Sequence, residues 1–279
     1  MPGGQLALGP RWLYPAKAAA TTARSARWLL RRGSGGEGIR ILFYHRVSPD
    51  RDELGLAPEK FAAQMERLAA LGLRAVDVNE AARALDAGIT AGLIGLSFDD
   101  GYQDVADHAL PVLDRLGFTA TVFIATGVTG GRAHFTWYEQ QPPLMSWDTI
   151  RALDGGPLRF EAHTVTHPNL LQLSDEDARR EITDSKAELE QQLGRRVDAF
   201  CYPAGLFGAR ERAYVEEAGF ANAVSCEPGI NTAATDRLAL LRRQIDRRDT
   251  MLDFRAKVAG AHDTPPALRG IYRRLRYGA

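Results

Sequence analysis

The sequence predicts an α/β protein in which helices cover the outside of a mainly parallel sheet. Strand-like and helix-like segments alternate along most of its 279 residues, which is the pattern of repeated βα units. The strand-like segment ATVFIAT (residues 120–126) is apolar on both faces, as expected where helices cover one face and a barrel or sheet interior fills the other. The length also fits a barrel-type α/β fold that forms a single domain.

The predicted elements follow one another as βα units after residue 38. The strand-like segments are residues 39–45, 74–78, 92–98, 120–126, 158–164, 199–203, 222–226 and 238–245, and the helix-like segments are residues 58–72, 79–88, 104–117, 146–155, 174–194, 208–219 and 250–260. The segment at 174–194 has the clearest helix signals. Ser174 can cap its start, three acids follow in the first turn, and Gly194 ends it. Its apolar side consists of Ala178, Ile182, Leu189 and Leu193.

Three regions follow from composition. Residues 1–38 form a basic arm that ends in the Gly/Ser-rich linker RRGSGGEG. We expect residues 39–261 to form a single domain and residues 262–279 to form a basic tail.

The basic arm lacks the unbroken apolar stretch of a secretory signal peptide. Its Arg31-Arg32 pair precedes glycine and serine, which argues against a twin-arginine export signal. We therefore expect a cytoplasmic protein without a transmembrane segment. An alternative for residues 11–32, where Trp and Leu alternate with Arg, is a short helix lying on a membrane surface.

The overall charge argues against nucleic acid as a partner. The formal net charge is +0 and the sequence pI is about 7.0, so no global field attracts polyanions. Cys201 and Cys226 both lie in apolar runs, which fits buried hydrophobic residues better than a disulfide framework.

Polar side chains recur where the predicted strands end. Parallel α/β folds collect their functional groups at the carboxyl ends of strands. These residues are His45, Asp99, Asp100, His163, His167, the YPAG turn at 202–205, Arg242 and Arg243. Because five strand ends contribute, we expect one shared pocket.

The segment HTVTH (His163 to His167) has the spacing of a helical metal site, but a helix is not expected. Its central residues are β-branched and Pro168 follows. A strand end entering a loop can still bring both imidazoles to a metal. Alone, such a pair more often belongs to the surface or the core, and FDDG alone is ordinary turn chemistry. Together, two histidines and one carboxylate match a catalytic zinc site with an open position.

The motifs FYHRVSPD, LSFDDGY, HTVTH and FCYPAG, in this order from about Ile41 to Lys257, resemble those of the polysaccharide deacetylases, the NodB-homology group of carbohydrate esterase family 4. The resemblance implies a distorted (β/α) barrel. It also implies hydrolysis of N-acetyl, or sometimes O-acetyl, groups on sugars with a divalent metal. Zn²⁺ is the expected ion, with Co²⁺ or Ni²⁺ as alternatives.

The resemblance also assigns roles. Asp99 matches the catalytic base, and Asp100, His163 and His167 match the metal ligands. Such a metal lowers the pKa of water from about 15.7 to about 7, so that the base can take its proton. Ala204 stands where the family uses a backbone N–H to stabilise the oxyanion.

Other positions depart from the family pattern. The third motif lacks its usual arginine, and Arg243 resembles the arginine before the C-terminal helix, so we expect Arg243 to hold Asp99 or substrate, with Arg242 as the fallback. The histidine motif that supplies the general acid is not recognisable. His45 is the candidate for a pocket acid or substrate contact, and His262 is a weaker candidate.

Two further features have no fixed role. Strand alternation places Glu161 on the side of His163, which suggests a partner of the metal ligands or a wall of the sugar pocket. The Gly/Pro-rich segment 128–143 carries Trp137 and Tyr138 and predicts an irregular lip over the pocket.

The sequence thus predicts a metal-dependent deacetylase of an N-acetylated saccharide, polysaccharide or glycolipid. Two alternatives remain open at this point. One is a hydrolase of another non-peptide C–N bond on the same scaffold. The other is an inactive saccharide-binding relative, which the unrecognised general acid leaves open.

Overall fold

The structure is a computed structural model that describes residues 38–50, 52–261 and 263. The segment with predicted membrane contact (residues 11–32) and His262 lie outside the described residues. So do nearly all of the predicted arm and tail, whose boundaries therefore remain predictions.

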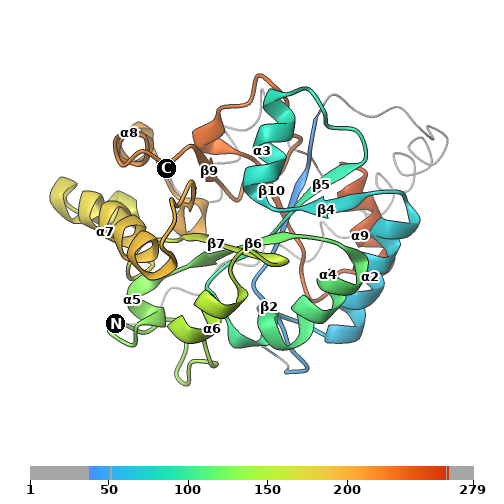
Figure 1. Ribbon diagram of the computed structural model, residues 1–279, viewed down its shortest axis with the longest axis horizontal. Coiled ribbons are helices and arrows are strands. Elements are labelled where there is room, and N and C mark those ends of the chain that lie inside the picture. The colour runs from blue at the N-terminus through green and yellow to red at the C-terminus, as the bar shows by residue number, and fades with distance from the viewer. Residues whose placement is uncertain (1–37, 51, 262, 264–279) are drawn as a thin grey trace, which may run out of the picture.

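Eight parallel strands form one curved sheet (Figure 1). Its order is β10-β1-β5-β6-β7-β8-β9, and β4 pairs with the start of β5. The strands are β1 (Ile41–Tyr44), β4 (Arg74–Val76), β5 (Leu93–Phe98), β6 (Ala120–Ile124), β7 (Leu158–Ala162), β8 (Ala199–Cys201), β9 (Asn222–Val224) and β10 (Arg242–Gln244). A separate small sheet joins β2 (Arg46–Val47) and β3 (Gly55–Leu56).

The sheet nearly closes on itself between β9 and β10. Leu240 forms a parallel bridge with Val224, and its N–H donates to Ala223 O at 2.8 Å. Two residues later, β10 begins and pairs with β1. The fold is therefore the distorted (β/α) barrel that was predicted, with strands short enough to leave it irregular.

Helices surround the barrel, as the alternating pattern predicts. They are α2 (Pro58–Ala70), α3 (Val78–Asp86), α4 (Leu110–Leu116), α5 (Thr126–Thr129), α6 (Trp147–Leu153), α7 (Asp175–Leu193), α8 (Ala209–Glu217) and α9 (Met251–Val258). A π-helical turn, η2 (Val105–Ala109), precedes α4, and short 3-10 turns η3 (Leu170–Gln172), η4 (Pro203–Gly205) and η5 (Arg237–Ala239) occur in loops.

The strands are apolar on both faces because the protein has two main cores. Inside the barrel, side chains such as Ile41, Phe123 and Val224 pack against α3. Outside it, alternate residues such as Leu42 and Val122 pack against the surrounding helices. The interior core fills the barrel beneath the carboxyl ends of the strands, where the predicted site residues lie.

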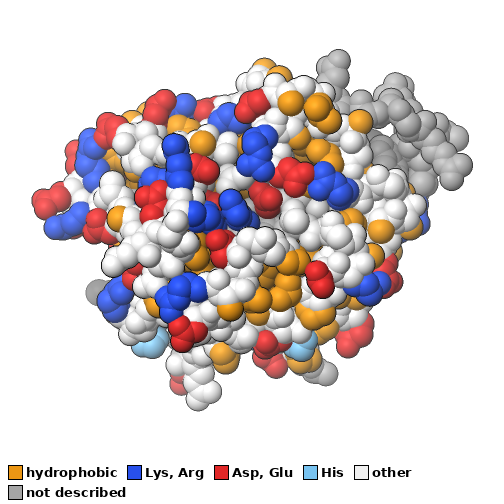
Figure 2. Space-filling view, viewed as in Figure 1, with side chains coloured by type: hydrophobic (Ala, Val, Ile, Leu, Met, Phe, Trp, Pro, Cys, Tyr) orange, Lys and Arg blue, Asp and Glu red, His pale blue; other side chains and the backbone are white. Residues whose placement is uncertain are grey.

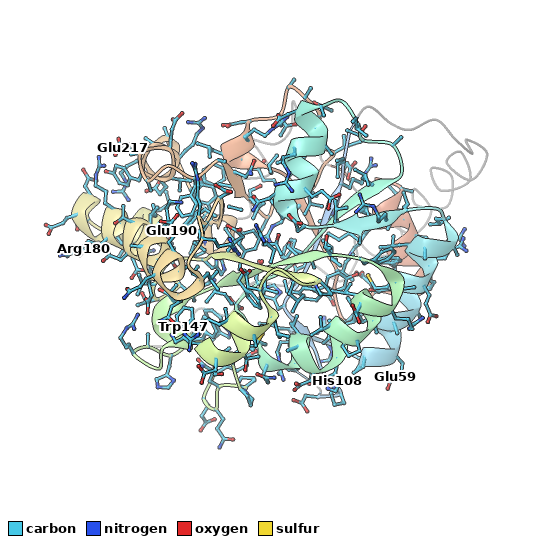
Figure 3. The ribbon with its side chains drawn as sticks, in the orientation of Figure 1. Glu59, His108, Trp147, Arg180, Glu190 and Glu217 are labelled. Carbon is cyan, nitrogen blue, oxygen red and sulfur yellow. The ribbon has the colours of Figure 1, made fainter. Side chains whose placement is uncertain are left out.

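Helix α7 begins and ends at the predicted residues. The Ser174 side chain accepts the Asp177 N–H, and Gly194 has a left-handed φ of 64°. Ala178, Ile182 and Leu189 are fully buried, whereas Arg180 points away from the sheet (Figure 3). Packing of this apolar stripe fixes α7 beside β7.

The visible surface mixes charges of both signs (Figure 2). This agrees with the formal net charge of +0. No helix among the described residues has both the length and the apolar composition needed to cross a membrane.

Glu161 supports the barrel and does not line a pocket. Its side chain is 0% exposed. It accepts hydrogen bonds from Asn79 Nδ2 (2.9 Å), Arg195 Nη1 (3.2 Å) and the backbone N–H groups of Asp198 and Ala199. The suggestion that Glu161 forms a wall of the sugar pocket is therefore wrong, because its carboxylate joins β7 to α3 and to the start of β8.

We predict that Glu161→Gln destabilises the fold. The new amide group would face donors that need an acceptor, so the free energy of unfolding should fall by about 2 to 3 kcal/mol. Urea denaturation measures this change. The matched control is Glu66→Gln, whose carboxylate pairs with Arg115 in the solvent and should change stability by less than about 0.5 kcal/mol. Equal effects of the two substitutions would contradict a supporting role for Glu161.

Candidate metal and catalytic site

The two adjacent aspartates leave β5 in different directions. The Asp99 N–H still donates to Tyr44 O at 3.0 Å, as in the sheet. Asp100 then adopts a left-handed φ of 75°, and Gly101 follows with φ 74°. A Cβ on Gly101 would lie 2.6 Å from Ile124 Cδ1, so both this contact and the left-handed φ favour glycine here. The turn separates the two carboxylates.

Asp99 forms a buried ion pair with Arg242. The distances are 2.6 Å from Arg242 Nη1 to Asp99 Oδ1 and 2.9 Å from Nη2 to Oδ2. The guanidinium also donates to Ser97 Oγ, Ser225 O and Cys201 Sγ. Arg242 is 0% exposed and lies over the ring of Phe43. The Asp99 carboxylate is therefore held in one orientation by a fully desolvated cation.

The prediction that Arg243 holds Asp99 is wrong, and the fallback residue, Arg242, makes this contact. Adjacent residues of a strand point to opposite faces. Arg242 faces the barrel interior, whereas Arg243 Nη2 lies 3.6 Å from Asp263 Oδ1. The sequence shows two consecutive arginines and not which of them faces inward.

Asp100 lies against both predicted histidine ligands. Asp100 Oδ1 is 3.6 Å from His163 Nε2 and 3.8 Å from His167 Nε2. Their ligand atoms all lie within 4.8 Å of one another. His167 is the most exposed of the three, at 14% of its side chain against 2% for the others. The cluster is therefore open to solvent on the His167 side.

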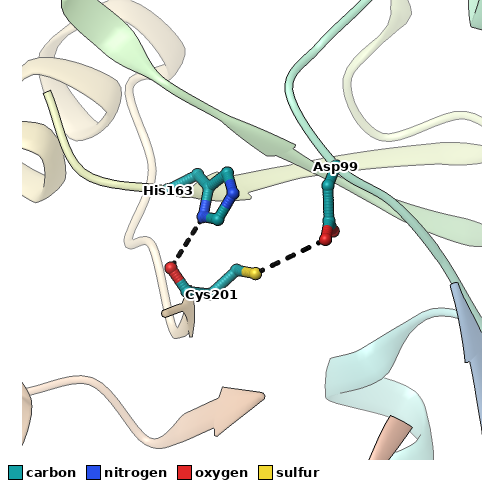
Figure 4. A group of neighbouring side chains, drawn as sticks. All are labelled: Asp99, His163 and Cys201. Carbon is teal, nitrogen blue, oxygen red and sulfur yellow. Dashed lines mark hydrogen bonds between the residues drawn. The ribbon is translucent and has the colours of Figure 1, made fainter. Parts of the chain in front are cut away.

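A second set of contacts orients the histidines. His163 Nδ1 lies 2.7 Å from Cys201 O at the end of β8 (Figure 4), which leaves Nε2 to point at Asp100. Thr164 and His167 both have left-handed φ values, 66° and 59°. Such non-glycine conformations persist only where the surroundings enforce them.

Glu181 on α7 supplies part of this support. Its carboxylate accepts the N–H groups of Val165 (2.8 Å) and Thr166 (2.9 Å), and the Thr166 hydroxyl at 2.6 Å. Three hydrogen bonds to one carboxylate hold the backbone between the two histidines. Glu181 does not stand out in the sequence, because one glutamate among several acids of a helix carries no signal of its own.

Burial sets the protonation of the cluster. It lowers the pKa of His163 to about 4 and, together with the nearby His163, that of His167 to about 3. Burial and the neighbouring Asp99 charge raise the pKa of Asp100. Burial opposes ionisation of Asp99 as well, but the charge and hydrogen bonds of Arg242 prevail and lower its pKa to about 2. Asp99 thus stays ionised between neutral imidazoles.

These residues fit a divalent cation. Metal ligands must be deprotonated, and both imidazoles are neutral at ordinary pH. Asp100 Oδ1 is buried and has no hydrogen-bond partner among the described residues, which is costly unless a cation or another group pairs with it. A bound cation would also reverse the rise in the pKa of Asp100.

A second cluster overlaps the first and is a poorer metal site. Asp99, His163 and Cys201 also place ligand atoms within 4.8 Å (Figure 4). Arg242 Nη2 lies 3.0 Å from Cys201 Sγ, however, and pairs with Asp99. Burial raises the pKa of the Cys201 thiol. A cation there would meet a fixed positive charge and a protonated thiol, so Asp100, His163 and His167 form the better site.

The other predicted residues lie at neighbouring strand ends. Ala204, in η4 after β8, has φ 52° and is exposed, and within the described chain its N–H donates to no acceptor. His45 follows β1 and is half-buried. Burial lowers the pKa of His45 and the charge of Asp99 opposes this. Trp137, in the segment predicted to form a lip, lies beside His167.

The nearly closed parallel barrel, with Asp and two His at its carboxyl ends, defines a carbohydrate-deacetylase type of (β/α) barrel. Known proteins with a similar sequence or fold point to the same class. Residues 88–223 match the family model for polysaccharide deacetylase. YxkH of Bacillus subtilis (strain 168), described as a polysaccharide deacetylase, is 28% identical over 207 residues, or 74% of this chain and 70% of YxkH.

Two solved structures have a fold similar to that of this chain. The deacetylase PplD of Streptococcus pyogenes, in complex with acetate, has a TM-score of 0.67 and 26% identity over 76% of this chain and 93% of PplD. IcaB from Ammonifex degensii has a TM-score of 0.69 at 24% identity, covering 81% of this chain and 97% of IcaB, and supports the fold. The chain is thus similar in sequence and in fold to polysaccharide deacetylases, and these comparisons support a carbohydrate deacetylase of the hydrolase class.

We predict that Glu181→Ala weakens metal binding without unfolding the protein. The loop between His163 and His167 would lose three hydrogen bonds, so zinc affinity measured by calorimetry should fall about 10- to 100-fold. The matched control is Glu176→Ala on the same helix, where the carboxylate pairs with Arg180 in the solvent and affinity should not change. Unchanged zinc affinity in Glu181→Ala would show that the loop holds its shape without this residue.

Proposed function

We propose that the protein is a metal-dependent deacetylase that removes N-acetyl groups from a saccharide, polysaccharide or glycolipid. The observation that carries this proposal is the separation of the adjacent aspartates. Asp100 faces His163 and His167, while Asp99 is held by Arg242. This is one ligand set and one separate base, side by side.

We assign the divalent cation to Asp100, His163 and His167, with Zn²⁺ as the expected ion and Co²⁺ or Ni²⁺ as alternatives. A bound cation of this kind makes water more acidic and polarises the acetyl carbonyl. Two neutral imidazoles and one carboxylate are a common catalytic zinc set that leaves a position open.

Asp99 is the proposed base. Its carboxylate adjoins the ligand set, and its low pKa keeps it ionised throughout the working pH range. Arg242 has two opposing effects on it. The ion pair fixes the orientation of the carboxylate, which favours proton transfer in a defined geometry, but it also makes the carboxylate a weaker base.

The Ala204 N–H is the proposed donor to the oxyanion that forms when the acetyl carbonyl is attacked. Its left-handed backbone conformation and unused N–H are features that cluster at functional sites. One such donor typically lowers the barrier by about 3 kcal/mol. His45 is the proposed substrate contact. Because burial lowers its pKa, it would be present as a neutral imidazole, which is better suited to a hydrogen bond than to supplying a proton.

The relatives support acetyl transfer to water as the chemistry. PplD is described as a deacetylase in complex with acetate, which is the product expected here. An N-acetylated saccharide is therefore the proposed substrate of this chain.

The direct test is acetate release from N-acetylated oligosaccharides with chelator, and after zinc, cobalt or nickel is restored. We predict that chelation abolishes release and that metal restores it. Asp99→Asn should lower kcat by about 10²- to 10⁴-fold yet keep its metal, whereas Asp100→Ala should lose the metal. Full activity in the presence of chelator would refute these assignments. So would loss of the metal in Asp99→Asn if Asp100→Ala retained it.

A second prediction concerns pH. Arg242 lowers the pKa of Asp99, so replacing it with Gln should raise that pKa. Because the ionised carboxylate is the active form, the acid limb of the kcat/KM profile should move to higher pH. The variant should also lose about 3 to 5 kcal/mol of stability, since a buried charge would be left unpaired.

Arg242→Lys is the matched control for this prediction. It keeps the charge but not the paired hydrogen bonds, and its acid limb should lie between those of the wild type and Arg242→Gln. An acid limb that stays at the wild-type pH in folded Arg242→Gln would show that Arg242 does not control the base.

A further inference from the structure

The loop between α5 and α6 carries three aromatic residues, Phe135, Trp137 and Tyr138, which we call the aromatic lip. Phe135 is 1% exposed, whereas Trp137 is 43% exposed. Trp137 is one of only three large hydrophobic side chains that are exposed in the described part of the chain. Because this exposed indole lies beside the proposed catalytic site, it is a candidate ligand contact.

Trp137 adjoins the candidate metal cluster. Its ring centroid lies 4.8 Å from that of His167, with an interplanar angle of 69°. Its ring also stacks on Phe135 at 4.6 Å and 17°. One face of the indole is therefore covered by the lip itself, and the remaining surface lies next to the most exposed of the three ligands.

The barrel holds the lip in place. Tyr138 Oη donates to Asp52 Oδ2 at 2.8 Å, and Asp52 Oδ2 also accepts from Arg46 Nη1 at 2.8 Å. Arg46 is 4% exposed and pairs with Asp104 in the loop after β5 at 2.7 Å. A residue fixed before the ligand arrives loses little conformational entropy on binding.

We propose that Trp137 is a stacking residue that binds the C–H face of a hexosamine ring and so places its acetamido group over the metal cluster. This inference rests on the proposed saccharide substrate. Pyranose rings of the gluco series present axial C–H groups on their faces, and an indole offers a broad apolar surface of matching size. Stacking would favour ring substrates over acyclic acetates.

The test compares a β-1,4-linked trimer of N-acetylglucosamine with ethyl acetate, a small acyclic ester. Trp137→Ala should raise KM for the trimer about tenfold and change kcat by less than about twofold. Its kcat/KM for ethyl acetate, which has no ring to stack, should fall less than its kcat/KM for the trimer. Trp137→Phe keeps an aromatic face and should recover most of the lost affinity. Leu252→Ala, at an exposed apolar residue on α9, is the matched control.

A binding measurement separates this inference from the proposed function. In an Asp99→Asn background, the trimer should quench tryptophan fluorescence. Trp137→Phe should abolish the quench, whereas Trp147→Phe in α6 should retain it. Failure of the wild type to release acetate would count against the proposed function, and the fluorescence titration would still decide the stacking role. Equal KM values, or equal quenching, with and without Trp137 would overturn the inference.

Discussion

The buried ion pair between Arg242 and Asp99 is the interaction on which the rest of the site depends. Two adjacent carboxylates in an apolar barrel repel each other and lose their hydration. Arg242 compensates one of them with a bidentate contact, so Asp99 stays ionised. Asp100 is then left with two neutral imidazoles and one buried oxygen without a hydrogen-bond partner. The same sequence motif thus supplies a fixed anion, Asp99, and the proposed cation ligand, Asp100.

The contact between Arg242 and Asp99 therefore depends on closure of the barrel. Arg242 and Asp99 are 143 residues apart in the chain and meet because β10 pairs with β1, which pairs with β5. The bridge between Leu240 and Val224 positions the chain just before β10. The last strand is therefore as important to the site as the aspartates themselves, although its side chains need not touch substrate.

The order of βα units, the two apolar strand faces and the caps of α7 could be predicted from the sequence, because they follow from local periodicity and capping chemistry. The strand-end residues could also be predicted, since parallel strands end at one edge. Three features could not. Which of Arg242 and Arg243 contacts Asp99 depends on which of these two consecutive residues faces the barrel interior when β10 pairs with β1. Glu161 and Glu181 look like ordinary strand and helix residues, and their burial or loop contacts arise only from tertiary packing.

The central claim is that Asp100, His163 and His167 hold the cation while Arg242 keeps Asp99 apart from it. Anomalous diffraction from zinc-loaded crystals tests it most directly. The account predicts one ion about 2.0 to 2.2 Å from the Asp100 carboxylate and from Nε2 of both histidines, with the pairing of Asp99 and Arg242 intact. An ion coordinated instead by Asp99 and Cys201, with Arg242 displaced, would contradict it.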